Sequence, residues 1–342
     1  MANQKFSLLK LKREDDRTVL RLFIVLIGVF ILMSILRPSL FLRQSNFISM
    51  ANQFPEYGLM AIGISLTMIS GGIDLAVVGT ANLSAIISAQ YLLAAVPRNT
   101  PAEQTLPAIL TAICLALLVG LAAGAFSGFL IARLRIPAIL ATLGAQQLYT
   151  GIAIVITGGR PLSRLPVLYS RIGNAEIFGF LPVPFILYTL SAIAIGIVLG
   201  KTSFGLKLYL VGTNAKAALY AGIENRMVLL KTYMLSGLLS SLAGLIMMAR
   251  TNSAKADYGA AYTLQCVLIA VLGGVDPNGG LGTIRGVTLA VLILQFLSSG
   301  LNMFEQVSNF YRDLIWGGVL ILALIFNWFI TRNSEKSVVL KG

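Results

Sequence analysis

The chain has 342 residues, of which 57% are hydrophobic and only 11% are charged, whereas a soluble domain has about 25% charged residues. This composition excludes a soluble protein and indicates a polytopic membrane protein with room for roughly nine to eleven spans of about 20 residues each. The net charge of +13 is scattered among apolar segments, so it indicates membrane topology and not nucleic-acid binding.

Ten apolar segments follow a polar, basic tail at residues 1–18. They run over about residues 19–36, 41–70, 75–96, 108–132, 138–157, 183–200, 227–249, 260–272, 286–301 and 314–330. Residues 19–331 thus form one transmembrane domain, followed by a second tail at 332–342. With the N-terminus inside, 17 of the 26 Lys and Arg residues fall on the cytoplasmic side, as the positive-inside rule requires. We therefore expect an all-α integral membrane protein with both termini in the cytoplasm.

The fourth segment carries three glycines four residues apart, which are Gly120, Gly124 and Gly128. Small residues at this spacing lie on one face of a helix, where they let a second helix approach closely. The sequence therefore predicts a tightly packed neighbour for this segment.

The loop at 201–226 is the largest predicted cytoplasmic loop and contains four basic residues and one acid. Asn214 or Thr213 can cap a short helix that ends near Gly222. Leu219 and Ile223 are four residues apart, so we expect them to share one face of that helix.

Two glycines, Gly205 and Gly212, are expected to break the chain before this short helix. A capped helix in a basic loop has two interpretations: it is a plain connector, or it is a docking element for a soluble partner. Local sequence leaves both open.

Two glycine-rich sequences interrupt the apolar segments, GGID at 71–74 and GGVDPNGGLG at 273–282. The residues that define these breaks are Gly71, Gly72, Asp74, Gly273, Gly274 and Asp276. Backbone N–H and C=O groups that lose their helical hydrogen bonds at membrane depth are tolerated only where protein or water binds them. Transporters use such discontinuous helices to bind solutes. The simpler interpretation is that Asp74 and Asp276 cap the helices that follow. The short similarity leaves open whether the pair is an internal repeat.

Few polar side chains fall within the apolar segments. Glu56 is a functional candidate as an intramembrane acid, although after Pro55 it can also lie at the level of the lipid headgroups. The uncharged candidates are Asn82, Gln146, Gln147 and Gln295. These side chains could line a path for a hydroxylated solute or hydrogen-bond helices to one another.

The chain lacks the residues for chemistry of its own. It has no histidine, no HExxH motif and no Ser/Lys or paired Asp set at membrane depth, so we expect neither an enzyme nor a bound metal or cofactor. It also lacks a Walker motif, so active transport would need an outside source of energy. An ion-coupled secondary carrier usually needs several buried ionisable groups, and it remains the alternative from another class.

Three motifs in this order resemble the permease subunit of bacterial ribose-type ABC importers, within the branched-chain amino acid/ribose permease superfamily. They are GGIDLAV at 71–77, TSFGLKLYLVGTNAKAALYAGI at 202–223 and LGGVDPNGGLGTIRG at 272–286, and the resemblance covers nearly the whole chain. Two positions depart from the family pattern. Val78 stands where the family usually has glycine, and Gly79 follows one place on. Leu206 stands where the family usually has a basic residue, and Lys207 follows one place on.

This resemblance implies ten helices in the vitamin B12-type (type II) permease fold, with discontinuous helices at the Gly-Gly-x-Asp breaks, in the bacterial inner membrane. It implies a second permease copy or a similar paralogue, an extracytoplasmic sugar-binding protein, and separate ATPase subunits that hold ATP and Mg. The solute would be a small neutral pentose or hexose, with autoinducer-2 as the alternative. The outer loops at 158–182 and 302–313 are candidate docking sites for the binding protein.

In such a family, the loop after the sixth helix carries the coupling helix that docks on the ATPase. The positions that match are Gly205, Gly212, Asn214, Ala217, Leu219 and Gly222. The resemblance therefore favours the docking interpretation of this loop over the connector.

Overall fold

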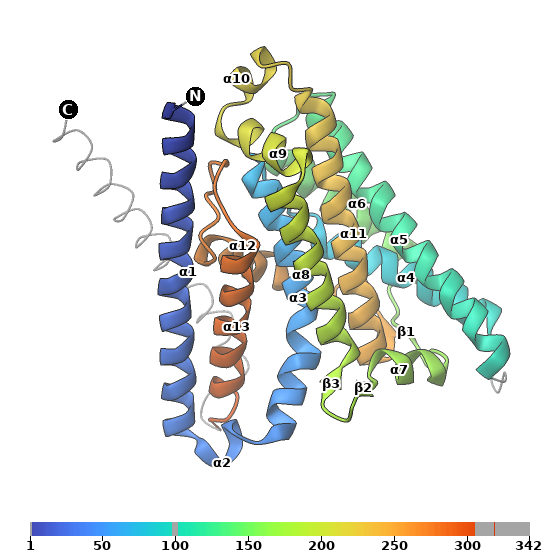
Figure 1. Ribbon diagram of the computed structural model, residues 1–342. Coiled ribbons are helices and arrows are strands. Elements are labelled where there is room, and N and C mark those ends of the chain that lie inside the picture. The colour runs from blue at the N-terminus through green and yellow to red at the C-terminus, as the bar shows by residue number, and fades with distance from the viewer. Residues whose placement is uncertain (1, 98–101, 305–317, 319–342) are drawn as a thin grey trace.

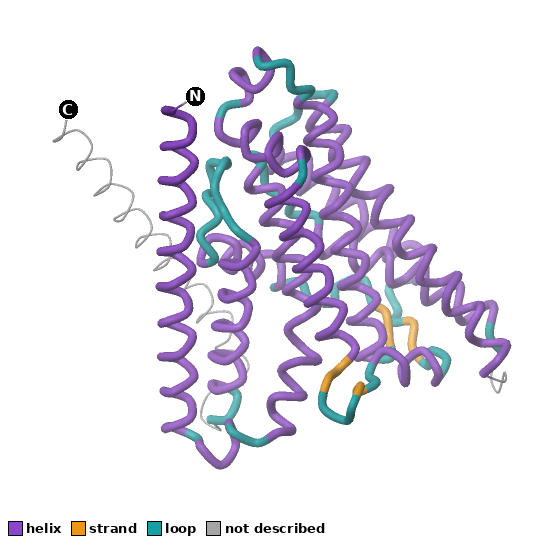
Figure 2. The backbone as a smooth tube through the Cα atoms, viewed as in Figure 1, coloured by secondary structure: helices purple, strands orange, loops and turns teal. Residues whose placement is uncertain are grey.

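Helices make up most of the chain in the computed structural model, which describes residues 2–97, 102–304 and 318 (Figures 1 and 2). The helices are α1 (Ala2–Leu36), α2 (Pro38–Phe41), α3 (Gln44–Ile69), α4 (Val77–Ala95), α5 (Ala102–Ala132), α6 (Ala138–Thr157), α7 (Val167–Gly173), α8 (Val183–Lys201), α9 (Ser203–Thr213), α10 (Ala215–Tyr220), α11 (Asn225–Thr251), α12 (Tyr262–Leu272) and α13 (Ile284–Leu301). Short strands form two antiparallel pairs, β1 (Leu162–Ser163) with β4 (Ser253–Ala254) and β2 (Glu176–Ile177) with β3 (Leu181–Pro182). Apart from Gly318, the predicted tenth segment and the C-terminal tail lie outside the described residues, as does most of the predicted outer loop at 302–313.

Seven helices in the described part of the chain are long and apolar enough to cross a membrane, and they are α1, α4, α5, α6, α8, α11 and α13. Their bounds agree with the predicted segments to within a few residues, except at the ends of α1 and α5. The helix α1 starts at Ala2, so the predicted polar tail continues the first span as one helix. No proline interrupts this stretch, and the chain has no reason to leave the helix there.

The helix α3 lies at the centre of the bundle, where it packs on α8, α11, α12 and α13. Its residues from Phe54 to Ile69 are all buried. Because protein surrounds α3, it can carry polar side chains that a lipid-facing helix could not. By contrast, α1, α5, α6 and α8 bury only a minor share of their residues and form the apolar perimeter.

The two ends of the bundle differ. Figure 1 shows α9, α10 and the N-terminal end of α1 at one end, with α2, α7 and the β2–β3 hairpin at the opposite end. At that second end, Tyr169 anchors α7 to α11 by donating to the Leu245 carbonyl oxygen at 2.8 Å. Burial raises the pKa of Tyr169, so this hydroxyl stays a neutral donor at physiological pH.

Glycines bring α5 and α11 into backbone contact, as the four-residue spacing predicts. A Cβ atom added at Gly124 would overlap the backbone of Tyr233, and one at Gly128 would lie 3.1 Å from the Leu230 Cα. A Cβ at Gly120 would likewise overlap the carbonyl oxygen of Gly237. No larger residue fits between these two helices at their present distance.

Replacing Gly124 by leucine should therefore destabilise the bundle, because α5 would have to move away from α11. Overpacking of this kind costs about 1–3 kcal/mol. The matched control is Gly144→Leu on α6, where a Cβ would meet nothing within 4 Å. Thermal unfolding in detergent, followed by circular dichroism, should show a lower midpoint for Gly124→Leu only, and equal midpoints would contradict this packing.

Candidate functional site

The three glycine-rich motifs meet at one point, although they are far apart in the sequence. The Gly280 N–H donates to the Ile69 carbonyl oxygen at 2.9 Å, which joins the two breaks directly. A Cβ atom at Gly212 would overlap that same carbonyl oxygen and lie 2.6 Å from the Gly280 nitrogen. The Tyr209 hydroxyl adds a hydrogen bond to the Gly282 carbonyl oxygen at 2.7 Å. We name this contact the glycine junction, formed by residues 69–72, 209–213 and 279–282.

Only glycine can occupy the centre of the junction. Gly71 and Gly279 have φ angles of +86° and +95°, in the region that L-residues rarely adopt. A Cβ at Gly279 would also lie 2.8 Å from the Gly71 Cα and 2.9 Å from the Gly212 oxygen. The glycines therefore pack backbone on backbone, and the Tyr209 hydroxyl adds a side-chain hydrogen bond to the Gly282 oxygen.

Protein groups satisfy the polar groups of the first break, and Asp74 makes most of these hydrogen bonds. Its Oδ1 accepts from the Ala76 N–H at 2.9 Å, directly before α4, and its Oδ2 accepts from the Ser236 hydroxyl of α11 at 2.7 Å. The Asp74 N–H in turn donates to the Thr67 hydroxyl at 3.1 Å. The prediction that Asp74 caps the next helix is wrong, because the N-cap residue of α4 is Ala76, two residues further on, and α4 has no side-chain cap. The Asp74 carboxylate instead closes a turn before α4 and joins the break to α11.

The prediction that Asp276 caps the following helix is wrong. Its Oδ1 accepts from the Asn278 N–H at 2.8 Å and closes a turn within the loop. Thr283 caps α13 instead, and its hydroxyl accepts from the Gly286 N–H at 3.2 Å. The loop between Asp276 and α13 is too long for the aspartate to reach the helix, and a threonine stands directly before the first turn.

The second break also uses glycines for close packing. A Cβ at Gly273 would lie 2.7 Å from the Val287 Cα, and one at Gly286 would overlap the Gly273 carbonyl oxygen. Gly274 follows with a φ of +84°, which turns the chain out of α12. These glycines allow α12 and α13 to cross at backbone distance.

The short helix in the loop forms as the sequence predicts. The Asn214 Oδ1 accepts from the Ala217 N–H at 3.0 Å and caps α10. At the other end, Gly222 has a φ of +80°. The Gly222 N–H donates to the Leu219 oxygen and the Ile223 N–H to the Ala218 oxygen, both at 3.0 Å, which is the hydrogen-bond pattern of a Schellman motif.

The two glycines before this helix do not break the chain, and that prediction is wrong. Gly205 and Gly212 both lie inside α9, which Thr202 caps through a hydrogen bond from the Gly205 N–H at 3.2 Å. A Cβ at Gly205 would overlap the backbone of Leu199. Both glycines serve close packing of α9 on its neighbours, so they face the rest of the chain and not an outside partner.

One face of α10 points away from the rest of the chain. Leu219 and Tyr220 are 61% and 91% exposed, whereas Ala218 and Ile223 are buried. The prediction that Leu219 and Ile223 share a face is wrong, because the Schellman motif folds Ile223 back over Ala218. We name the outward residues the α10 face, and they are Lys216, Ala217, Leu219 and Tyr220.

Three of the four candidate path residues hold elements together. Asn82 donates to the carbonyl oxygens of Ala256 and Tyr258 at 3.0 and 2.9 Å. Gln146 accepts from the Gly79 N–H at 2.7 Å, which joins α6 to α4.

Gln295 accepts from the Tyr57 hydroxyl and joins α13 to α3. Gln147 is exposed on α6. Helix-to-helix bonding is thus present, and lining of a path stays a prediction for these four residues. No group of three or more His, Cys, Asp or Glu side chains among the described residues is placed to hold a metal ion.

An ion pair that sequence reasoning missed joins three central helices. Glu56 is fully buried on α3, and its depth relative to the lipid headgroups stays a prediction. Arg250 of α11 binds it through two hydrogen bonds, Nε to Oε1 and an Nη to Oε2, the second at 3.0 Å. Tyr262 of α12 donates to Oε2 at 3.4 Å. The available signal was a lone arginine at the end of an apolar segment, which needs a partner if it packs inward.

A bundle with seven helices long and apolar enough to cross a membrane, and with glycine breaks after α3 and α12, is typical of a membrane transport protein. Residues 46–324 match the family described as branched-chain amino acid transport system / permease component, and the chain belongs to this family. It is 34% identical over 306 residues to the ribose import permease protein RbsC of Bacillus subtilis, which covers 88% of this chain and 91% of the relative. RbsC of Escherichia coli K12 is 31% identical over 310 residues, with the same coverage.

A second kind of relative is as similar. The autoinducer 2 import system permease protein LsrC of Yersinia enterocolitica is 31% identical over 281 residues, which covers 82% of this chain and 74% of the relative. The resemblance to ribose-type permeases that the three motifs predict is confirmed by these matches.

Removing Arg250 should destabilise the fold far more than removing an exposed basic residue. Breaking a buried pair costs about 3–5 kcal/mol, and we expect the lower end for Arg250→Gln because its side chain is 33% exposed. The matched control is Lys255→Gln, whose exposed pair with Asp257 is worth about 0–1 kcal/mol. Denaturant unfolding should separate the two variants, and adding Glu56→Gln to Arg250→Gln should restore part of the loss. Equal effects at both sites would refute the buried pair.

Proposed function

We propose that the chain is the permease subunit of an ABC importer and forms the path for a small neutral carbohydrate of the pentose or hexose type. An extracytoplasmic binding protein delivers the solute, and separate ATPase subunits hold ATP and Mg and supply the energy. The chain itself is no enzyme and binds no cofactor. The family match and the names of the ribose permease relatives support this assignment.

The single observation that carries the proposal is the glycine junction. It places the end of α9 in backbone contact with both membrane breaks, and α9 leads directly into α10. Asn225 holds α10 from the other side, because its Nδ2 donates to the Ala215 oxygen at 2.6 Å. A displacement of α10 by a docked ATPase would therefore reach the breaks without passing through flexible side chains.

The α10 face is the proposed contact with the ATPase. An aromatic side chain that is 91% exposed at the tip of a short capped helix suits insertion into a partner's cleft, because tyrosine is enriched among the strongest interface contacts. Leu219 and Ala217 flank Tyr220 on this face. The other matched positions would act indirectly, by setting the shape and position of α10. They are Gly205, Gly212, Asn214 and Gly222.

The remaining architecture follows from the family. We propose ten spans in the type II fold within residues 19–331, both termini and the α10 end in the cytoplasm, and the tails at 1–18 and 332–342 outside the membrane domain. The binding protein would dock at the opposite end of the bundle, on the loop at 158–182 that carries α7 and the β2–β3 hairpin. A second permease copy or a similar paralogue would complete the path between the two subunits, in the bacterial inner membrane.

Uptake by proteoliposomes tests this class against an ion-coupled carrier. The permease is reconstituted with its ATPase and binding protein, and labelled ribose and autoinducer-2 are supplied in parallel, because relatives of both kinds are about equally similar. We expect uptake of one solute to require both ATP and the binding protein. Uptake that persists without ATP and collapses with the ion gradient would contradict the proposal.

A charge on the α10 face should uncouple the permease from its ATPase. Ala217→Asp places a carboxylate on an exposed position, so the chain still folds, but a docked ATPase would bury that charge. Desolvation of a carboxylate costs several kcal/mol, which predicts a loss of transport of more than about tenfold. Ala217→Asn adds a side chain of nearly the same size and shape without the charge and is the control. Unchanged transport by Ala217→Asp would leave α10 a plain connector.

A further inference from the structure

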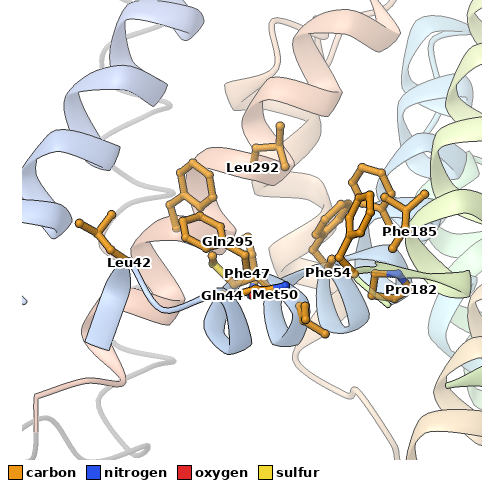
Figure 3. A pocket seen from close by; sticks show the side chains of 14 residues that line it. Leu42, Gln44, Phe47, Met50, Phe54, Pro182, Phe185, Leu292 and Gln295 are labelled. Atoms are coloured by element: carbon orange, nitrogen blue, oxygen red, sulfur yellow. The ribbon is translucent and has the colours of Figure 1, made fainter. Parts of the chain in front are cut away.

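A groove of about 590 Å³ opens on the side of the bundle between α3, α8 and α13 (Figure 3). Its wall is aromatic and aliphatic, with Phe47, Phe54, Phe185 and Phe296 contributed by three different helices. The polar lining residues are two glutamines, and the oxygen of one of them, Gln295, already accepts from Tyr57. The surface is thus suited to an apolar occupant and offers few hydrogen-bonding groups to a sugar.

The groove is about as long as one membrane leaflet is deep. It follows α3 from Gln44, at the start of the helix, to Phe54. At 1.5 Å per residue this stretch is about 15 Å long, which is half of the roughly 30 Å hydrocarbon core. The start of α3 lies beside α2 at the end of the bundle opposite α10 (Figure 1), so the groove begins at that end of the bundle.

An exposed cation lies next in sequence to two residues of the groove. Arg43 is exposed and lies between Leu42 and Gln44, which both line the groove. Among the residues that the structure describes, Arg43 forms no ion pair. It is also the N-cap residue of α3 and provides no side-chain cap, so the positive end of the helix dipole adds to its charge.

We propose that the groove binds an anionic phospholipid, with one acyl chain along the phenylalanines and the phosphate at Arg43. The apolar wall of leaflet depth suits the chain, and the unpaired guanidinium at headgroup level suits the phosphate, which arginine binds through paired hydrogen bonds. The site lies away from the glycine junction and the α10 face. It requires only that the bundle spans a membrane, so it is independent of the transported solute.

Native mass spectrometry of the purified chain tests the site. The protein is delipidated in detergent and titrated with phosphatidylglycerol and, separately, phosphatidylcholine. We expect one tightly retained phosphatidylglycerol, with retention reduced about fivefold by Arg43→Gln, the effect of one basic residue near the membrane surface. Ala51→Trp, which fills the groove, should reduce retention of both lipids.

Matched controls separate this site from general lipid contact. Arg171→Gln removes an exposed cation from α7 at the same end, and Leu148→Trp enlarges an exposed side chain on α6; neither should change retention. Size-exclusion chromatography checks that each variant folds, and Arg43→Gln changes only an exposed side chain.

Three results would overturn the proposal. The first is equal retention by the wild type, Arg43→Gln and Ala51→Trp. The second is a change of oligomeric state by Ala51→Trp with lipid retention intact, which would assign the groove to a second copy of the chain. The third is a loss of uptake by Ala51→Trp with lipid retention intact, which would assign it to the solute.

Discussion

Backbone contact at the glycine junction is the constraint on which the arrangement of this permease depends. The Gly280 N–H bonds to the Ile69 oxygen, and Gly212 lies against both atoms with no room for a Cβ. Backbone packed on backbone is stiff, because it has no rotamers to adjust. It fixes α9 on the end of α3 and on the loop between α12 and α13, and α10 is attached to α9. The loop that carries α9 and α10 and the two glycine breaks are therefore parts of one structural unit.

The central helices contain the polar groups, and the perimeter is left to lipid. Glu56 with Arg250 and Asp74 with Ser236 each join α3 or the break after it to α11. Buried in the bundle, these groups find partners that lipid could not provide. This explains why α3, the most enclosed helix, is absent from the helices that hydropathy alone identifies as spans.

Local sequence was sufficient to predict what depends on neighbours in the chain. The span bounds, the Asn214 cap, the turn at Gly222 and the small-residue contact of α5 are all of this kind. Predictions failed where a distant segment decides the outcome. Glycine normally favours a break in a helix. Gly212 nevertheless remains in α9, because Ile69 and Gly280 lie against it. The pairing of Glu56 with Arg250 likewise depends on how α3 and α11 meet, which no local pattern encodes.

Hydrogen–deuterium exchange at the loop of residues 274–283 tests the glycine junction most directly. The Gly280 N–H is bonded to a carbonyl oxygen of another segment, so the account predicts slow exchange, comparable to that of helix amides. Gly212→Ala should accelerate exchange in peptides that contain Gly280, whereas Gly200→Ala, where a Cβ meets nothing within 4 Å, should not. Rapid exchange in the wild type, or equal rates in all three proteins, would contradict the account.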